Sequence, residues 1–375
     1  MEGLLFSHSS TKKLLKQLPK DHKIVLLEHE DLDSLAVDGL IKKEVKVILN
    51  IENSMSGKYE HNQVERLLHA GIEVYDCHVK TQQERRALEQ LNDVYVEILN
   101  NQLYFKQNKV CDLQPYELNK VNVLNEQAKE NYSSTFKNFI TNSVSYMDKE
   151  LAHFSQPIGL PNCMKKVEGK PVFIIARNAY YEKDIKAMKK KIKQLNAIIV
   201  AVDGAADSLL SLDLKPHFIV GDMDSVSNTS LKCDAEIICH RYLTGQSPAI
   251  ERVNALGCDK VSEFTFVGTS EDLAIYLTYW SDAKHLYLIG CRIGMSEFLE
   301  KGRSGMSSSI LSRIQAGNKM TDLKGIHQLY RSNKIQFQLS ESFKGVNKTI
   351  KLLTTISRQL LLPFKLYDKW KKESL

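Results

Sequence analysis

Short apolar runs alternate with helix-like patterns in the first third of the chain. The runs at residues 23–28, 45–50 and 72–76 are typical of buried strands, and residues 31–43 and 63–70 carry apolar side chains at helical spacing. Strands that alternate with helices in this way usually pair in parallel through right-handed crossovers. The pattern therefore predicts an N-terminal Rossmann-like βαβαβ unit.

The pattern changes after this unit. Apolar and polar residues alternate over residues 94–105 around the pair Asn100-Asn101, which predicts a hairpin in a small β insert. Residues 117–154 carry apolar side chains at helical spacing and predict a long linking helix, with a break near residues 131–134. Prolines at positions 157 and 161 then interrupt the pattern and indicate a domain boundary.

A second series of strands and helices follows these prolines. Its short apolar runs lie at residues 171–176, 197–202, 217–221, 235–239, 264–267 and 286–290. Six such runs with helices between them predict a doubly wound parallel sheet, so the expected fold class is α/β. The predicted parts of the chain are a Rossmann-like domain (1–90), a β insert (91–116), a helical linker (117–165), a second α/β domain (166–335) and a tail (336–375).

Composition and charge narrow the class of protein. The 375 residues are 43% hydrophobic and 26% charged, which is typical of a globular protein with well-formed cores. Residues 345–375 carry seven Lys or Arg against two acids, which accounts for +5 of the net charge of +6. The rest of the chain is nearly neutral, which makes the protein a poor candidate for a dedicated nucleic-acid binder, because such a protein needs a basic groove or helix in its fold. The seven cysteines include no C-x-x-C pair, so neither a disulfide framework nor a zinc site is indicated.

The two ends of the chain bear on localisation. Glu2 and the polar residues 8–10 are incompatible with a signal peptide, and no run reaches the 18 apolar residues of a membrane span. We therefore expect a cytoplasmic protein. The tail alternates basic residues with apolar residues between Ile350 and Leu361. Such a segment is typical of a helix that lies on an anionic membrane surface, docks on a partner or caps a core.

Acidic residues follow two of the predicted strands in the second series. Gly221, Asp222 and Asp224 end or follow the run at 217–221, and Asp203 follows the run at 197–202. Ligands of open α/β sheets bind outside the carboxyl ends of the strands, so these acids are expected to face a site. Carboxylate oxygens suit a Mg2+ ion that also holds phosphate oxygens, and a glycine lets a ligand approach the backbone.

A third loop of this kind follows the run at 264–267. Thr269 and Ser270 precede a predicted helix, whose first N–H groups and dipole favour an anion. Taken singly, each of the three loops is equally typical of a helix cap. Taken together, they favour a phosphate-and-metal site.

Other segments are weaker candidates. Arg177 follows a strand and is suited to clamping a phosphate. The segment His29-Glu30-Asp31-Leu32-Asp33 also follows a strand, so it is a candidate metal or substrate site, but acids are equally favoured in a first helical turn without any ligand. Residues 53–59 lack the first glycine and the final Ser or Thr of a phosphate loop. Residues 297–309 are compatible with a loop whose Arg303 reaches a phosphate, or with a packed helix pair at a subunit contact.

Parts of the chain resemble two families. The order Asp203-Gly204-Ala205-Ala206, Gly221-Asp222-Met223-Asp224-Ser225 and Ser270-Glu271-Asp272 resembles the catalytic domain of thiamine pyrophosphokinases, which move a diphosphate from ATP to thiamine with Mg2+. Over residues 20–335 the chain is similar to the SteA-like proteins, described as cytokinetic-ring proteins of Gram-positive bacteria. The segments that carry this second resemblance are 29–33, 56–59, 221–227, 268–272 and 297–306.

The resemblance to pyrophosphokinases implies a role for each matching residue. It makes Asp222 and Asp224 catalytic residues and, together with Asp203, Mg2+ ligands. With Arg303 added from the later loop, the predicted nucleotide-binding residues are Asp203, Gly204, Ala205, Gly221, Ser225, Thr269, Ser270, Asp272 and Arg303. Related pyrophosphokinases are dimers, which implies a homodimer.

Three functions stay open at this point. The favoured one is an ATP-binding, Mg2+-dependent protein of bacterial cell division or envelope assembly, cytoplasmic or held at the inner face of the membrane by a membrane-bound division partner. The second is an active diphosphokinase that transfers diphosphate from ATP to thiamine or another small acceptor. The third is a structural protein with a degenerate site.

Overall fold

The computed structural model describes residues 1–8, 10–19, 24–245, 247 and 249–330. The chain divides into two compact units, Met1–Lys324 and Gly325–Leu375. Of the second unit, the described part contains a short 3-10 helix, η3 (Ile326–Tyr330). The predicted basic amphipathic tail at 336–375 lies outside the described residues.

The first unit begins with a closed seven-stranded barrel of order β1-β2-β3-β4-β7-β6-β5. Its strands are β1 (Glu2–Ser7), β2 (Ile24–Leu27), β3 (Val47–Asn50), β4 (Glu73–His78), β5 (Val94–Leu99), β6 (Gln102–Phe105) and β7 (Asn108–Pro115). Its helices are α1 (Thr11–Gln17), α2 (Ser34–Lys42), α3 (Gln63–His69) and α4 (Gln82–Glu89). Neighbouring strands from β1 to β4 are parallel, and β5, β6 and β7 pair antiparallel.

Two hydrophobic clusters explain why the early strands are apolar at every position. Ile24 and Leu26 of β2 pack with β5 to β7 in one cluster, whereas Val25 and Leu27 pack with the helices in another. Successive side chains of a strand point to opposite faces, so both faces of β2 are buried.

The expected Rossmann-like unit with a separate β insert is therefore wrong in its finer form. The parallel run from β2 through α2, β3 and α3 to β4 is present, but its sheet does not end there. β4 pairs with β7, and β5 pairs with β1, which closes the barrel. The hairpin strands β5 and β6 each have one apolar face. In the closed barrel these faces point inward and are buried in one hydrophobic cluster.

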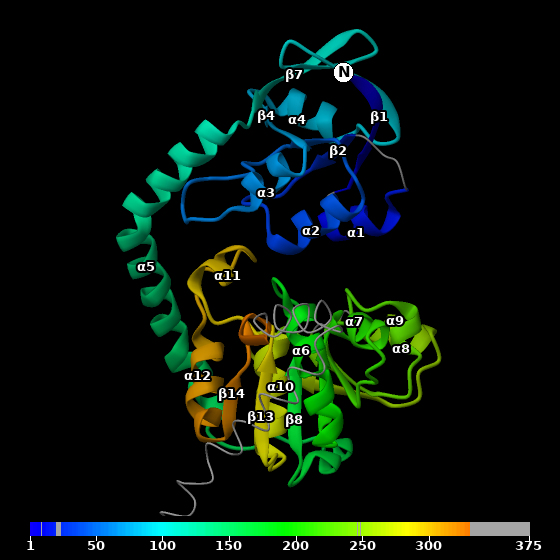
Figure 1. Ribbon diagram of the computed structural model, residues 1–375, viewed down its shortest axis with the longest axis vertical. Coiled ribbons are helices and arrows are strands. Elements are labelled where there is room, and N and C mark those ends of the chain that lie inside the picture. The colour runs from blue at the N-terminus through cyan, green and yellow to red at the C-terminus, as the bar shows by residue number, and fades with distance from the viewer. Residues whose placement is uncertain (9, 20–23, 246, 248, 331–375) are drawn as a thin grey trace, which may run out of the picture. The chain divides into compact units, whose positions relative to one another are not determined.

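The hairpin itself is confirmed. Asn100 and Asn101 connect β5 and β6 with φ angles of 49° and 57°, the left-handed conformation that a two-residue turn requires and asparagine tolerates. The helix α5 (Leu118–Phe154) is confirmed as well, but the predicted break near 131–134 is wrong, because α5 runs unbroken over 37 residues (Figure 1). The Ser134 hydroxyl donates to the Asn131 carbonyl at 2.9 Å within the helix, so these polar side chains do not interrupt it.

The second half of the unit contains a seven-stranded parallel sheet of order β12-β11-β10-β9-β8-β13-β14. Its strands are β8 (Pro171–Ile175), β9 (Ile198–Val202), β10 (Phe218–Gly221), β11 (Glu236–Arg241), β12 (Val261–Thr265), β13 (His285–Ile289) and β14 (Met320–Asp322). The helices are η1 (Asn162–Val167), α6 (Tyr181–Gln194), α7 (Ala205–Ser211), α8 (Asn228–Leu231), α9 (Ile250–Ala255), α10 (Ser270–Trp280), α11 (Met295–Leu299), α12 (Ser307–Ala316) and η2 (Gly317–Lys319). The α/β class is thus confirmed.

The order of this sheet reverses beside β8. The strands from β8 to β12 follow one another outward in one direction, and β13 then returns to the other side of β8. In parallel sheets such a reversal opens a crevice at the carboxyl ends of the two strands that flank it.

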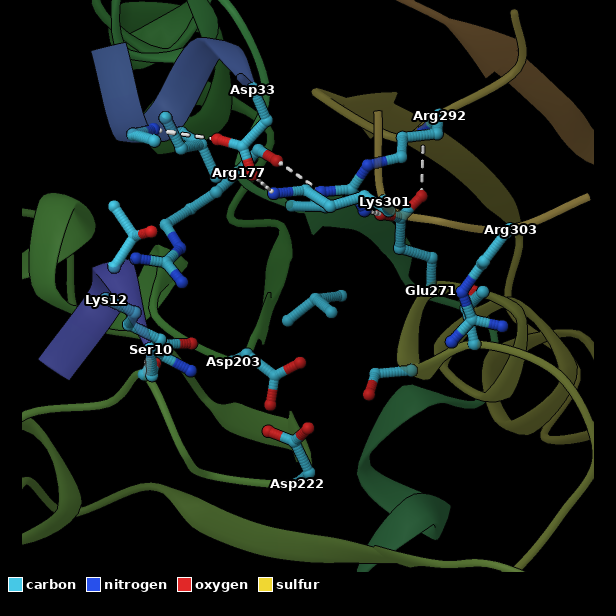
Figure 2. Close-up of a pocket in the computed structure, with 18 of the residues that line it drawn as sticks. Ser10, Lys12, Asp33, Arg177, Asp203, Asp222, Glu271, Arg292, Lys301 and Arg303 are labelled. Atoms are coloured by element: carbon cyan, nitrogen blue, oxygen red, sulfur yellow. Dashed lines mark hydrogen bonds and ion pairs between the residues drawn. The ribbon is translucent and has the colours of Figure 1, made fainter. Parts of the chain in front are cut away.

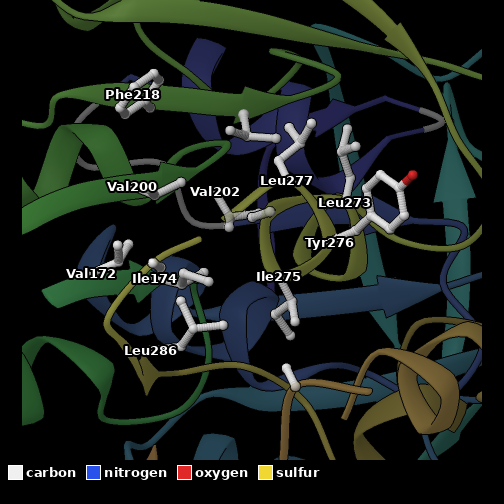
Figure 3. Packing of buried hydrophobic residues seen from close by; sticks show 14 of the residues in the cluster. Val172, Ile174, Val200, Val202, Phe218, Leu273, Ile275, Tyr276, Leu277 and Leu286 are labelled. Atoms are coloured by element: carbon white, nitrogen blue, oxygen red, sulfur yellow. The ribbon is translucent and has the colours of Figure 1, made fainter. Parts of the chain in front are cut away.

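Buried side chains of α10 hold one face of the sheet. Val172, Ile174, Val200 and Val202 of the central strands pack in one cluster with α10, whose Tyr276 is fully buried (Figure 3). This packing fixes the start of α10 beside the carboxyl ends of the strands. Among the described residues, no helix has the length and apolar character needed to cross a membrane.

Candidate functional site

A cavity of about 790 Å³ lies at the carboxyl ends of the parallel strands. Residues that follow β8, β9, β10, β11, β12 and β13 line one side of it, which includes the crevice beside β8. Residues of α1, the end of β2 and the start of α2 line the other side. The cavity therefore lies between the sheet and the barrel, and its size is typical of a small-molecule site.

Two carboxylates face each other at the floor of this cavity. Asp203 follows β9 and Asp222 follows β10, and Figure 2 shows the two carboxyl groups pointing toward one another. Asp203 accepts a hydrogen bond from the Met223 N–H at 3.1 Å, and Asp222 accepts one from the Asp224 N–H at 3.1 Å. Both acids are thus oriented by the backbone of the loop after β10.

Gly221 makes room for this pair. Its φ is +147°, and a Cβ built on it would lie 2.0 Å from Asp203 Oδ1. The space beside Gly221 is therefore occupied by the Asp203 carboxylate, whereas the sequence predicted a close approach of the ligand to this backbone. The glycine still determines the site, because any larger residue would displace Asp203.

The pair is electrostatically strained without a cation. Burial and then the charge of Asp222 raise the pKa of Asp203 to about 7, although hydrogen bonds from Met223 and Ser270 lower it. Two like charges at short distance cannot both ionise easily. A bound divalent cation would remove this repulsion.

Three basic side chains face the cavity without a partner. Arg177 follows β8, Arg303 lies between α11 and α12, and Lys12 belongs to α1. Among the described residues, none of the three side chains forms a hydrogen bond or an ion pair. By contrast, Arg292 pairs with Glu271, and Lys301 pairs with Asp33 at 2.5 Å.

Specific contacts position two of these cations. The Arg177 guanidinium lies over Gly204, where a Cβ would meet its Cζ at 2.6 Å. The loop around Arg303 is held by α5: Asn142 donates to the Ser304 carbonyl at 3.3 Å, and the Met306 N–H donates to Ser143 Oγ at 3.0 Å. Residues 297–309 comprise the end of α11, a loop that brings Arg303 to the cavity, and the start of α12 at Ser307, and a subunit contact of these helices stays a prediction.

The structure brings most of the predicted site residues to this cavity. Those that line it are Asp203, Asp222, Ser225, Thr269, Ser270 and Arg303. Gly204 and Ala205 lie directly behind it at the start of α7, where the Gly204 N–H donates to Ser225 Oγ at 3.2 Å.

Asp224 and Asp272 lie elsewhere. The Asp224 side chain is exposed and does not line the cavity. Asp272 is fully buried, and its carboxylate accepts hydrogen bonds from the backbone and hydroxyl of Thr269, from Ser308 at 2.8 Å and from Ser309 at 2.7 Å. We correct its expected role, because a carboxylate that caps α10 and anchors α12 has no oxygen directed at a ligand.

The segment 29–33 has divided roles. Asp31 accepts hydrogen bonds from the Ser56 N–H at 2.7 Å and hydroxyl at 2.8 Å, and Asp33 caps α2 by accepting from the Ala36 N–H at 2.7 Å. His29 and Asp33 line the barrel side of the cavity. Burial lowers the pKa of His29, which favours the neutral form of its imidazole.

The described residues include no group of three or more His, Cys, Asp or Glu side chains placed to hold a metal ion, so the predicted set of three aspartates is reduced to the pair Asp203 and Asp222.

The sequence did not identify Lys12 as a residue of the site. Lys12 stands in a run of polar residues in which nothing distinguishes it from its neighbour Lys13. Only the approach of α1 to the sheet identifies it.

Comparisons with known proteins add no identity. No protein-family model matches the chain, and none of the curated proteins compared with it matches either. The function must therefore be argued from the site.

Proposed function

We propose that this cavity binds ATP, or a related nucleotide, together with Mg2+. The observation that carries the proposal is the pair Asp203 and Asp222, which faces three unpartnered cations, Lys12, Arg177 and Arg303, in one cavity at the carboxyl ends of a parallel sheet. A polyphosphate with its metal ion complements both kinds of charge at once.

Two carboxylates suffice for this metal. Mg2+ commonly keeps several waters and takes one or two protein carboxylates, and substrate phosphates supply its other ligands. Asp203 and Asp222 would hold the ion from one side. The shortage of a third acid is therefore compatible with Mg2+ that arrives with a nucleotide, and it disfavours a metal ion held by the protein alone.

The start of α10 supports phosphate binding nearby. Thr269 and Ser270 line the cavity at the first turn of this helix of 11 residues. The Thr269 N–H and hydroxyl donate to Asp272, so the Ser270 N–H together with the helix dipole would favour an anion here. Arg177, which follows β8 and lines the same cavity, is suited to a bidentate contact with the same phosphates.

The wider assignment is also a proposal. The strand-end acids, together with the resemblance of residues 203–225 and 270–272, support a doubly wound, thiamine pyrophosphokinase-like domain at residues 166–335. The broader resemblance to SteA-like proteins supports a role in bacterial cell division or envelope assembly, in the cytoplasm or at the inner face of the membrane through a membrane-bound partner. A homodimer is part of the same proposal.

A second candidate is an active diphosphokinase. The cavity extends beyond the metal pair to a barrel wall with Ser10, Thr11 and His29, which offers room and hydrogen-bonding groups for an acceptor. Catalysis would then consist of positioning the two substrates and neutralising the charge of the phosphates. Transfer of diphosphate to an added acceptor such as thiamine would distinguish this candidate.

Isothermal titration tests the first proposal. The purified full chain is titrated with a non-hydrolysable ATP analogue, with and without Mg2+, beside the variants Asp222→Asn and Asp224→Asn. We expect Mg2+-dependent binding that Asp222→Asn abolishes, whereas Asp224→Asn retains most of it because that side chain is exposed and outside the cavity.

Each other outcome has a definite meaning. Equal losses in the two variants would restore the three-aspartate metal set predicted from the sequence. Absence of binding by the wild type, at protein and ligand concentrations in the millimolar range, would refute the proposal and leave the structural interpretation.

A further inference from the structure

We propose that the barrel contributes directly to the nucleotide site: Lys12 of α1 binds the phosphate chain from the barrel wall of the cavity, while Arg177 binds it from the sheet, so that the ligand contacts both halves of the unit. This inference rests on the proposed nucleotide-binding function and adds to it a residue, a binding surface and a selectivity for polyphosphates. It assigns to the barrel a role that neither composition nor resemblance suggested.

The position of Lys12 carries the inference. Its side chain lines the cavity and is half-buried, and Figure 2 shows it beside the facing pair Asp203 and Asp222. The charged groups that act on it are Asp222, Asp224, Arg177 and Asp203, all of which lie at strand ends of the sheet. None of these acids forms an ion pair with it among the described residues.

A half-buried ammonium without a partner is costly, which suggests a missing ligand. Burial lowers the pKa of Lys12, and the nearby acids offset only part of this effect. Lysine is a compact point charge that serves phosphates well. A phosphate bound to a metal ion at Asp203 and Asp222 would lie next to this ammonium and would stabilise its charged form.

The helix α1 is built to present Lys12 in this direction. Leu14 is buried in the barrel cluster, and Leu18 just after the helix joins it there. Lys12 and Lys16 are four positions apart and therefore lie on one face of the helix. On that face the Lys16 ammonium donates to the Asp224 carbonyl at 3.4 Å, which brings α1 onto the loop that carries Asp222.

Two further contacts hold the barrel over the site. Lys301 forms its ion pair with Asp33 at 2.5 Å, and the Gln63 side chain donates to Glu300 at 3.4 Å. Both contacts connect the barrel to the loop between α11 and α12, which contains Arg303. The barrel and the sheet are thus in contact on two sides of the cavity, and a polyphosphate bound between Lys12 and Arg177 would add a third connection.

The inference predicts which ligands should lose affinity when Lys12 is replaced. A nucleoside triphosphate or diphosphate bound through the metal ion places phosphates at both cations, whereas a monophosphate offers a single phosphate and fewer contacts. Removal of one charged hydrogen bond to a ligand weakens binding by about 10–100-fold. We expect a loss of this size for the ATP analogue and a loss of at most about threefold for AMP.

The test compares two neighbouring lysines. Lys12→Ala and Lys13→Ala change the same residue type on the same helix, but Lys13 is exposed and does not line the cavity. Titration of each full-length variant with the ATP analogue and Mg2+, and separately with AMP, should show the loss only for Lys12→Ala and only for the polyphosphate. Equal thermal unfolding of both variants would show that the loss is not one of folding.

Hydrogen exchange provides a second, independent readout. In the wild type, the ATP analogue with Mg2+ should slow exchange of the α1 amides, and Lys12→Ala should remove this protection even at ligand concentrations that saturate it. Protection confined to the sheet in the wild type would overturn the inference.

Failure of the inference can be told apart from failure of the proposed function. If Asp222→Asn abolishes binding and Lys12→Ala leaves the affinity for the ATP analogue within twofold of the wild type, Lys12 is not a phosphate ligand and the proposed function stands. If the wild type binds no nucleotide, both are wrong.

Discussion

The repulsion between Asp203 and Asp222 leads to an unusual prediction: a substitution at the centre of the site should stabilise the protein. In Asp203→Asn the side chain keeps its shape and its Oδ1 can still accept the Met223 N–H, which lies at 3.1 Å. Asparagine also tolerates the φ of 48° at this position. The substitution therefore removes a charge and little else.

The pH dependence has a defined sign. The pKa of Asp203 is raised from 3.8 to about 7 in the folded protein, so between these values the folded chain holds a proton that the unfolded chain releases. The free energy of unfolding of the wild type should consequently fall as pH rises from about 4 to about 7. The neutral amide of Asp203→Asn lacks this contribution, so the variant should match the wild type near pH 4 and exceed it at pH 8.

The size of the effect follows from the same pKa. At 1.36 kcal/mol for each pH unit, a rise from 3.8 to about 7 corresponds to a ceiling of about 4 kcal/mol. Water in the cavity and sharing of the proton with Asp222 reduce this value. We expect a gain of about 1–2 kcal/mol at pH 8 in the absence of Mg2+.

Urea unfolding at pH 5 and pH 8, without Mg2+, measures the gain. The advantage of Asp203→Asn should grow between the two pH values, and the same variant should lose Mg2+-dependent nucleotide binding. This is the exchange of stability for function expected where an active or binding site stores repulsion. A variant less stable than the wild type at pH 8, or an advantage that does not change with pH, would refute the reasoning.

Two further substitutions test the supports of the site. Gly221→Ala should lower the free energy of unfolding by more than about 2 kcal/mol, because its Cβ would lie 2.0 Å from Asp203 Oδ1. Gly257→Ala is the control: a Cβ there meets nothing within 4 Å, so the substitution should cost about 1 kcal/mol through the positive φ alone. Urea unfolding compares the two variants. Asp272→Asn should lower the free energy of unfolding by about 2–4 kcal/mol in the same assay, because an amide cannot accept all the hydrogen bonds that the buried carboxylate receives. The affinity of the remaining folded protein for nucleotide should be unchanged.

The sequence predicted the elements that local patterns determine. The hairpin at Asn100-Asn101 and the strands β8 to β10 follow from alternation, turn chemistry and apolar runs within a few residues of one another. The three loops after β9, β10 and β12 were recognised as one edge of a sheet, because parallel strands place their carboxyl ends together. Asp203, Asp222 and Ser270 accordingly line one cavity.

Barrel closure could not be predicted in the same way. It depends on the pairing of β5 with β1, two strands far apart in the chain whose apolar faces fit either a barrel or a separate insert. The apolar pattern specifies that one face of β5 is buried, but it does not specify the surface that buries it. Prediction of the partner requires the tertiary packing.

Individual acids posed a related difficulty. The sequence alone does not distinguish Asp222, Asp224 and Asp272, because each of them follows a strand or begins a helix. The structure separates them by direction and burial: Asp222 faces the cavity, Asp224 faces solvent, and Asp272 is enclosed by the hydroxyls of α12. The serines at 308 and 309 gave the only hint, since a cluster of hydroxyls needs an acceptor, but nothing in the sequence identified Asp272 as that acceptor.

Lys12 connects the function proposed for the sheet with the barrel. A polyphosphate needs cations on more than one side, because its negative charge is spread along the chain and a single arginine reaches only part of it. The sheet half contributes Arg177 and Arg303, and the barrel lines the rest of the cavity. Leu14, Leu18 and the contact of Lys16 with Asp224 place α1 beside the cavity, so that the barrel adds Lys12 to the cations that line it. If a nucleotide occupies this cavity, the barrel is part of its binding site, and substitutions on α1 should alter affinity as directly as substitutions at the strand ends.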